Sequence, residues 1–158
     1  MKEEMQKIFD HVWDHFITEG NNFGTSPRDE DGDGGCAYRT ATGDRCALGL
    51  LIEDDEYIPD MEQASCPEDL FAWYKLPKTK KKWFPHRPWE ATRGPGFLEF
   101  LTSLQSVHDW AAEDRCTEAD EMRWGKGLKG KALMARSMKD LSVRFGLLCP
   151  DDKETCNG

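Results

Sequence analysis

Residues 36–48 read Cys36-Ala37-Tyr38-Arg39-Thr40-Ala41-Thr42-Gly43-Asp44-Arg45-Cys46-Ala47-Leu48, and this stretch decides the fold class. Two short runs, 36–39 and 45–48, flank a turn centred on Gly43, where glycine supplies the positive φ that a tight turn needs. The pattern predicts a β-hairpin. The apolar run 46–52 is equally compatible with a buried helical turn, because periodicity cannot separate the two in so short a segment.

Three longer segments around this stretch predict helices, because their apolar residues recur at steps of three and four. They cover residues 4–19, 97–113 and 128–145, and Gly20 and Gly146 follow the first and last of them as glycine C-caps. We therefore expect an α+β fold, in which a β-hairpin or small antiparallel sheet packs against three main helices. One domain would span 1–148, followed by a polar tail at 149–158.

Length and composition restrict the class of protein. A chain of 158 residues with 38% hydrophobic residues suits one core. No apolar stretch approaches the roughly 18 residues of a membrane span, and the N-terminal residues lack the pattern of a secretion signal. We therefore expect a cytoplasmic protein with no membrane partner. Its six cysteines form no C-x-x-C pair, so we expect reduced thiols and no structural zinc.

Charge is divided unevenly along the chain. The net charge is −9, but residues 75–93 carry +6, which leaves −15 for the remainder. Within that basic segment, cations alternate with aromatic residues that could stack on bases while the cations neutralise phosphates. The candidate binding residues there are Lys80, Lys81, Lys82, Trp83, Phe84 and Trp89. Such a basic run is more often a solvated connector than a binding surface. The acidic residues of the remainder more often keep a protein soluble than imitate the charges of DNA.

Two patterns resemble metal sites, and each is incomplete. Asp29, Asp31 and Asp33 match the first half of a calcium loop, but the twelfth position holds Thr40 where a bidentate Glu is required. His11 and His15 lie one helical turn apart, a spacing that suits Zn²⁺, but no third ligand is evident. A solvated acidic loop and two surface histidines are the simpler interpretations, so we expect no metal and no other cofactor.

A thiol enzyme would require Cys36 or Cys46 as nucleophile, His108 as base and Asp109 to orient the base. His108 and Asp109 are adjacent on a predicted helix, so their side chains should diverge by about 100°. We therefore expect Asp109 not to orient His108. His108 also falls on the apolar face of its helix, which favours a buried structural histidine over a catalytic one.

The motif Cys36-x-Tyr38-Arg39-x3-Gly43-x2-Cys46-Ala47-x-Gly49-x-Leu51-Ile52 resembles a family of small phage and prophage proteins. Further matching positions are Asp54, Asp55, Tyr57, Met61, Glu62, Leu104, Gln105, His108, Asp109 and Arg144 to Leu147. The likeness covers three blocks, near 4–19, 36–62 and 97–147. It implies a phage-like setting and no particular chemistry, and it directs attention to Tyr38, Arg39 and Glu62. These polar residues could equally form a buried network that holds the fold.

Three functions remain open from the residues. The leading hypothesis is an accessory binding protein of a phage type, made in an infected bacterium, that engages or inhibits a host protein such as a defence factor or nucleic-acid enzyme. The second is a small-ligand binder or thiol enzyme with a pocket near Cys36, Arg39 and His108, in which Arg39 would hold a phosphate or carboxylate. The third is nucleic-acid binding through 78–93.

Overall fold

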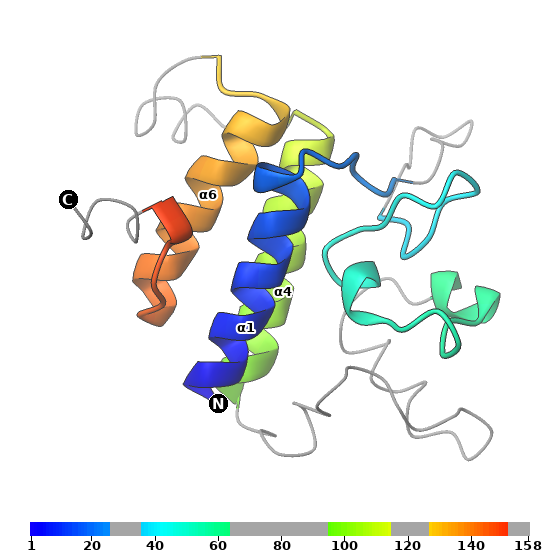
Figure 1. The fold of residues 1–158 in the computed structure, drawn as a ribbon, viewed down its shortest axis with the longest axis horizontal. Helices are drawn as coiled ribbons and strands as arrows, with labels where there is room; N and C mark the ends of the chain where they lie inside the picture. Colours follow the sequence, from blue (N-terminus) through cyan, green and yellow to red (C-terminus); the bar gives the residue numbers. More distant parts are fainter. Residues whose placement is uncertain (26–35, 64–94, 115–126, 152–158) are drawn as a thin grey trace.

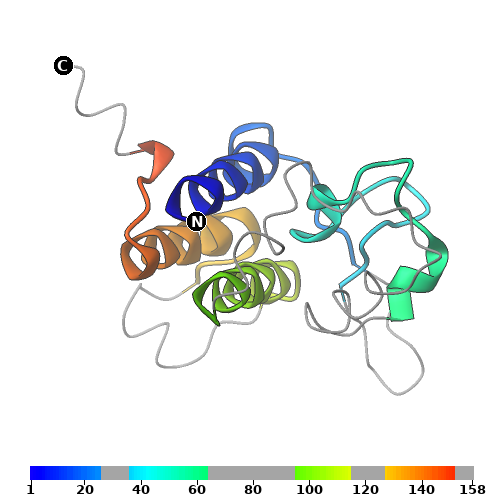
Figure 2. The same cartoon turned by 90° about the horizontal axis from the view of Figure 1, so that it is seen from below.

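Three helices form the body of the protein in the computed structural model, which describes residues 1–25, 36–63, 95–114 and 127–151. They are α1 (Lys2–Trp13), α4 (Pro95–Ala112) and α6 (Gly130–Phe145). Figure 1 shows them side by side, and in Figure 2 they are seen nearly end-on, with the segment 36–63 against one flank of the bundle. The short helical turns are η1 (Asp14–Thr18), η2 (Gly49–Leu51) and η3 (Pro59–Gln63).

The predicted α+β class is wrong: the described part of the chain is all-α and contains no strand or sheet. The turn at Gly43 does form, since Gly43 has φ +89° and the N–H of Thr40 donates to the carbonyl of Asp44 at 2.9 Å. Beyond the turn, however, only isolated bridges occur, between Phe23 and Arg45 and between Thr25 and Cys36. Gly24 bonds to both arms of the turn, since its N–H donates to the carbonyl of Arg45 at 3.0 Å and its carbonyl accepts from the N–H of Ala37 at 3.1 Å.

Burial explains why no strand continues past Cys46. A strand with one wet face alternates buried and exposed residues, whereas every residue from Cys46 to Gly49 is buried. A helical turn can bury consecutive residues against a surrounding core, and η2 follows at Gly49–Leu51. Of the two interpretations left open for the run 46–52, the buried helical turn is therefore confirmed.

The helices begin and end close to where the sequence predicts. Gly20 and Gly146 take the left-handed conformation, with φ +74° and +64°. After α6, the N–H of Leu147 donates to the carbonyl of Ser142 at 2.8 Å, which completes a glycine C-cap. The first helix widens before it ends, because its last turn, η1, is a π-helix. Both predicted glycine stops are confirmed.

One hydrophobic core joins all described segments. It contains Phe9, Val12, Trp13 and Phe16 from the first helix, Cys46, Ala47, Leu48 and Met61 from the segment 36–63, Phe100, Leu101 and Leu104 from α4, and Met134 and Met138 from α6. Because the turn segment contributes buried side chains to the same cluster, it is an integral layer of the fold and not an appended loop.

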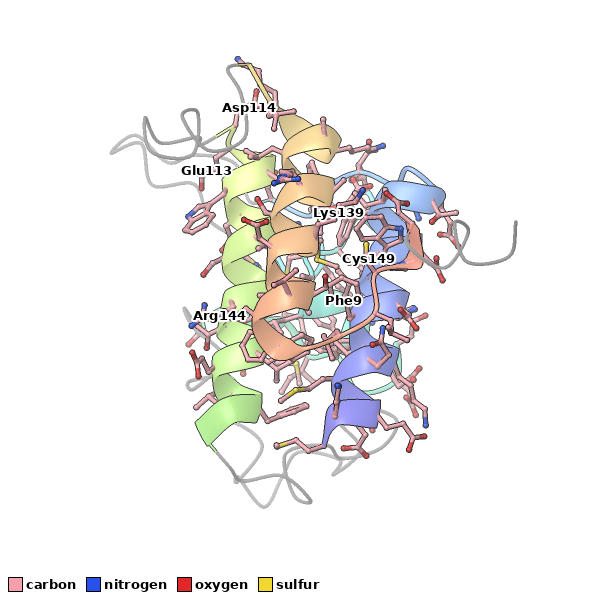
Figure 3. The ribbon with its side chains drawn as sticks, turned by 90° about the vertical axis from the view of Figure 1, so that its left-hand side faces the viewer. Phe9, Glu113, Asp114, Lys139, Arg144 and Cys149 are labelled. Carbon is pink, nitrogen blue, oxygen red and sulfur yellow. The ribbon has the colours of Figure 1, made fainter. Side chains whose placement is uncertain are left out.

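The chain after α6 is anchored as far as Cys149, one residue into the predicted tail. The side-chain amide of Gln6 donates to the carbonyl of Leu148 and accepts from its N–H, both at 2.8 Å. Cys149 is buried, and in Figure 3 it lies on the segment that returns from α6 toward α1. On the opposite side of α6, Arg144 pairs with Glu99 of α4. Residues 152–158 lie outside the described part.

The helices of the described segments include none that is long and apolar enough to cross a membrane. The longest, α4, has 18 residues and carries Gln105, His108 and Asp109 within its length. These polar groups have partners inside the protein, as described below.

Gly49 provides the first test of this arrangement. A Cβ at this position would lie 2.1 Å from the carbonyl oxygen of Tyr38, a backbone atom that cannot rotate away. We expect Gly49→Ala to lower the free energy of unfolding by about 3 kcal/mol, since overpacking against backbone forces the chain apart. Urea unfolding followed by circular dichroism measures it. Gly96→Ala is the matched control, because nothing lies within 4 Å of its Cβ position; equal losses in the two variants would contradict the close approach.

Candidate functional site

The carboxylate of Glu62 binds the backbone of the Cys36–Ile52 motif. It accepts hydrogen bonds from the N–H of Tyr38 at 3.0 Å, the N–H of Arg39 at 2.9 Å and the hydroxyl of Tyr57 at 2.8 Å. An ionised carboxylate is acceptor-only, and charge-assisted bonds of this kind are the stronger ones. Glu62, predicted as a binding residue, therefore binds this chain's own backbone.

The guanidinium of Arg39 is also committed to internal partners. One terminal nitrogen pairs with Asp54 and the other donates to the carbonyl of Ile52 at 2.8 Å. The group lies 4.9 Å from the centre of the Tyr57 ring, a cation–π distance. With both terminal nitrogens engaged, Arg39 does not present the free fork that bidentate binding of a phosphate requires.

Asp54 joins two arginines. It pairs with Arg39, and Arg45 donates to the same oxygen at 2.7 Å. The hydrogen bond and charge of Arg39, followed by the charge of Arg45, hold the pKa of Asp54 below its usual range. Because the Asp54 side chain is 75% exposed, solvent screens this pair and its contribution to stability is small.

A second chain of hydrogen bonds connects the motif to α4. The side-chain oxygen of Gln105 accepts from the N–H of Leu48 at 3.1 Å, and its amide donates to Asp109 at 2.6 Å. The same Asp109 oxygen lies 3.0 Å from Nδ1 of His108. Gln105 and Asp109 are four residues apart and so share a helix face.

The contact between His108 and Asp109 corrects the sequence analysis. Their Cα–Cβ bonds do diverge around the helix, but Asp109 stands at the edge of the buried face, and its carboxylate reaches back to the imidazole. Since Asp109 offers an acceptor, Nδ1 of a neutral His108 would carry the proton and Nε2 would be the acceptor. The prediction that Asp109 cannot orient His108 is wrong.

His108 is nevertheless inaccessible. Its side chain is 0% exposed, and its ring packs against Phe16 and Phe23, with ring centres 5.2 and 5.3 Å away. Within the described segments Nε2 has no hydrogen-bond partner. A general base must reach the proton that it abstracts, and an imidazole enclosed by two phenyl rings offers no path to a substrate.

The chemistry of Cys36 also opposes nucleophilic catalysis. A hydrogen bond to Cys46, then burial, then the negative charges of Asp109 and Glu62 raise the pKa of the Cys36 thiol far above its usual range. Reactive cysteines need the reverse, a thiolate stabilised by a nearby cation or helix N-terminus. The fold thus brings Cys36, His108 and Asp109 into one region without making a working nucleophile.

The histidines of α1 and η1 show no metal-site arrangement. His11 is exposed, while His15 is partly buried and lies 3.0 Å from the amide of Asn21. Burial lowers the pKa of His15. Across the described ranges, no three His, Cys, Asp or Glu side chains are grouped so that they could hold a metal ion.

Several predicted site residues lie outside the described residues, and their predictions stay untested. These are Asp29, Asp31 and Asp33 of the acidic loop, and Lys80, Lys81, Lys82, Trp83, Phe84 and Trp89 of the basic segment. Conversely, sequence reasoning missed the contact between Cys36 and Cys46, because each was considered only as a separate nucleophile. It also missed Asp54 as the acid shared by two arginines, although both lie in the motif.

Comparisons with known protein families, curated proteins and solved structures find no match to this chain. The resemblance to phage and prophage proteins therefore remains a prediction that rests on the motif residues. The structure shows a structural role for four of the residues that carry this resemblance. Tyr38 and Arg39 are bonded to Glu62 within the segment 36–63, and Gln105 with Asp109 links this segment to α4.

Glu62→Gln tests the first of these chains. The amide retains one acceptor oxygen but directs an NH₂ group at a backbone donor, so we expect a loss of about 1–2 kcal/mol in the free energy of unfolding. Chemical unfolding measures it. Asp60→Asn is the matched control: this neighbouring acid is exposed, has no described side-chain contact, and should change stability by less than about 0.5 kcal/mol. Similar values for both variants would argue against the Glu62 anchor.

The phenol of Tyr57 gives a pH-dependent test of the same contact. Burial and the hydrogen bond to Glu62 raise its pKa to about 12, against about 10 for a free tyrosine. The pKa is higher in the folded state, so the contact stabilises fully below about pH 10 and is lost as pH rises through about 12. The difference in tyrosinate absorbance between the parent and Tyr57→Phe reports this titration. A Tyr57 that titrates at the ordinary value would exclude the contact.

Proposed function

We propose that this chain is a phage-type accessory binding protein that engages a bacterial host protein and has no catalytic activity of its own. One observation carries the proposal: the polar residues that could perform chemistry are engaged in internal contacts, while a group of carboxylates beside them is exposed and makes no side-chain hydrogen bond or ion pair with the described residues. The phage setting and a cytoplasmic site of action rest on the resemblance of the motif.

The surface in question is the acidic segment, residues 53–63, which contains six acids and no Lys or Arg. Three of the six are committed: Asp54 to arginines, Glu62 to backbone, and Glu56 by burial. The other three are Glu53, Asp55 and Asp60. They are exposed, and no side-chain hydrogen bond or ion pair joins them to the rest of the described chain.

These features favour a protein partner with a basic face. Ile58 lies in the acidic segment and is 37% exposed, so an aliphatic group stands among the carboxylates. Interfaces combine an apolar contact with a charged rim, and the rim charges accelerate association and select the partner. The carboxylates repel the phosphates of nucleic acids, which makes a basic protein the better match for this surface. Nucleic-acid binding through 78–93 stays a separate prediction.

The segment is held in place before any partner arrives. Glu62 attaches the segment to the backbone of the motif, and Met61 is fully buried in the core. A surface that is ordered in the free protein loses less conformational entropy on binding. The internal network would therefore serve binding indirectly, by presenting Asp55 and Asp60 on a rigid support.

Charge reversal tests the proposal. The variant Asp55→Lys with Asp60→Lys should capture much less of its partner from bacterial lysate, and should weaken binding of the purified partner by about 100-fold, because two attractions become repulsions. Affinity should also fall as salt rises. The control Glu3→Lys with Glu19→Lys makes the same charge change at one residue of α1 and at the residue that follows η1. Equal affinity of both variants for the purified partner, with folding intact, would refute binding through the acidic segment.

A further inference from the structure

Cys36 and Cys46 are both free thiols, and a hydrogen bond joins their side chains. Their backbones are held in register beside the Gly43 turn, since the N–H of Cys46 donates to the carbonyl of Ala37 at 3.1 Å and the N–H of Ala37 donates to the carbonyl of Gly24 at 3.1 Å. Both side chains pack in or against the core. A hydrogen bond between the two thiols places their sulfurs next to each other, and a disulfide would join the same two atoms at about 2.05 Å.

We infer that Cys36 and Cys46 form a redox modification site, a dithiol that closes reversibly to a disulfide on exposure to a small-molecule disulfide such as oxidised glutathione. This inference is independent of the proposed function. It needs no partner protein and no acidic segment, only the pairing of the two thiols across the turn.

Exposure sets the order of events. Cys36 is partly exposed and Cys46 is fully buried. The thiolate of Cys36 attacks one sulfur of oxidised glutathione, which forms a mixed disulfide and releases one glutathione thiolate. The thiolate of Cys46 then attacks the Cys36 sulfur and releases the second glutathione. The two protein thiols lose two protons and two electrons, and oxidised glutathione gains them and becomes two glutathione thiols.

The environment makes this exchange slow and the reduced state persistent. Asp109 and Glu62 place negative charge near Cys36, and the mutual hydrogen bond stabilises the protonated thiol, so its pKa is raised and thiolate is scarce at neutral pH. A disulfide carries no charge, so the negative charges of these carboxylates do not destabilise it. The site would therefore resist brief exposure to alkylating agents and respond to sustained oxidising conditions.

Closure would act on the motif directly. The Cys46 sulfur accepts a hydrogen bond from the N–H of Gly49 at 3.3 Å, at the start of η2. A cross-link from Cys36 to Cys46 closes the eleven-residue loop of the turn, which removes freedom from the unfolded chain. Oxidation should therefore raise the melting temperature by about 5–10 °C.

Peptide mapping of the wild-type protein tests the site without relying on a variant that must fold. The folded chain is equilibrated with oxidised glutathione, free thiols are blocked, and trypsin with glutamyl endopeptidase is applied. Cleavage after Glu30, Arg39, Arg45 and Glu53 puts the two cysteines on peptides 31–39 and 46–53, separate from Cys66. We expect a linked pair of these peptides, lost on reduction, together with the rise in melting temperature.

Cys36→Ser is the control, because a hydroxyl at this partly exposed position keeps a hydrogen-bonding group beside Cys46. It should fold, form no such linked pair and show no shift in melting temperature with oxidant. The inference is overturned if the wild-type protein yields only a glutathione adduct on Cys36, links Cys36 to a different cysteine, or leaves both thiols reduced at the ratio of oxidised to reduced glutathione that oxidises a structural disulfide.

Discussion

The segment 36–63 depends on one carboxylate, that of Glu62, which receives two consecutive backbone N–H groups and a phenol from its own chain. In the described part of the chain, Tyr38 and Arg39 do not belong to a sheet, so their N–H groups have no partners on a neighbouring strand. A buried or half-buried N–H without a partner costs as much as a lost hydrogen bond. Glu62 supplies the acceptors that a second strand would otherwise provide, and a segment without sheet structure can therefore pack against the flank of the helical bundle.

The same constraint explains why the motif mixes glycines with polar residues. Gly49 has no side chain because the carbonyl of Tyr38 approaches it closely, and Gly24 meets the backbone at Arg45 and Cys46 in the same way. Close backbone packing leaves N–H and carbonyl groups away from water, and side chains such as Gln105 must then satisfy them. The glycines thus allow the backbone segments to approach closely. The polar side chains supply the hydrogen bonds that the backbone groups lose when water is excluded.

The helices could be predicted from the sequence because their apolar residues repeat along one face, and the glycines at 20 and 146 ended them as predicted. The hairpin could not be rejected, since the local signal at Gly43 was correct and the turn exists. Residues 23–25 form the isolated bridges to Cys36 and Arg45 that stand in place of a sheet, and no local pattern in the sequence reveals these contacts. For the site, the motif residues were identified, but their partners were long-range: Glu62 is 23 residues beyond Arg39, and Gln105 is 57 beyond Leu48.

The contact between His108 and Asp109 shows why a resemblance to part of a catalytic triad is insufficient evidence of an enzyme. An imidazole oriented by a carboxylate makes up two of the three members of such a triad, yet the Asp109 oxygen is shared with Gln105, which in turn holds Leu48. The contact between the Asp109 oxygen and Nδ1 of His108 has the same geometry in either case. It does not show whether the carboxylate orients a catalytic base or links a helix to a turn. The distinction comes from access: the His108 side chain is fully buried and its ring packs against Phe16 and Phe23, so the imidazole cannot reach a substrate. With these polar residues in structural roles, our proposal places the contact with a partner on the exposed carboxylates beside them.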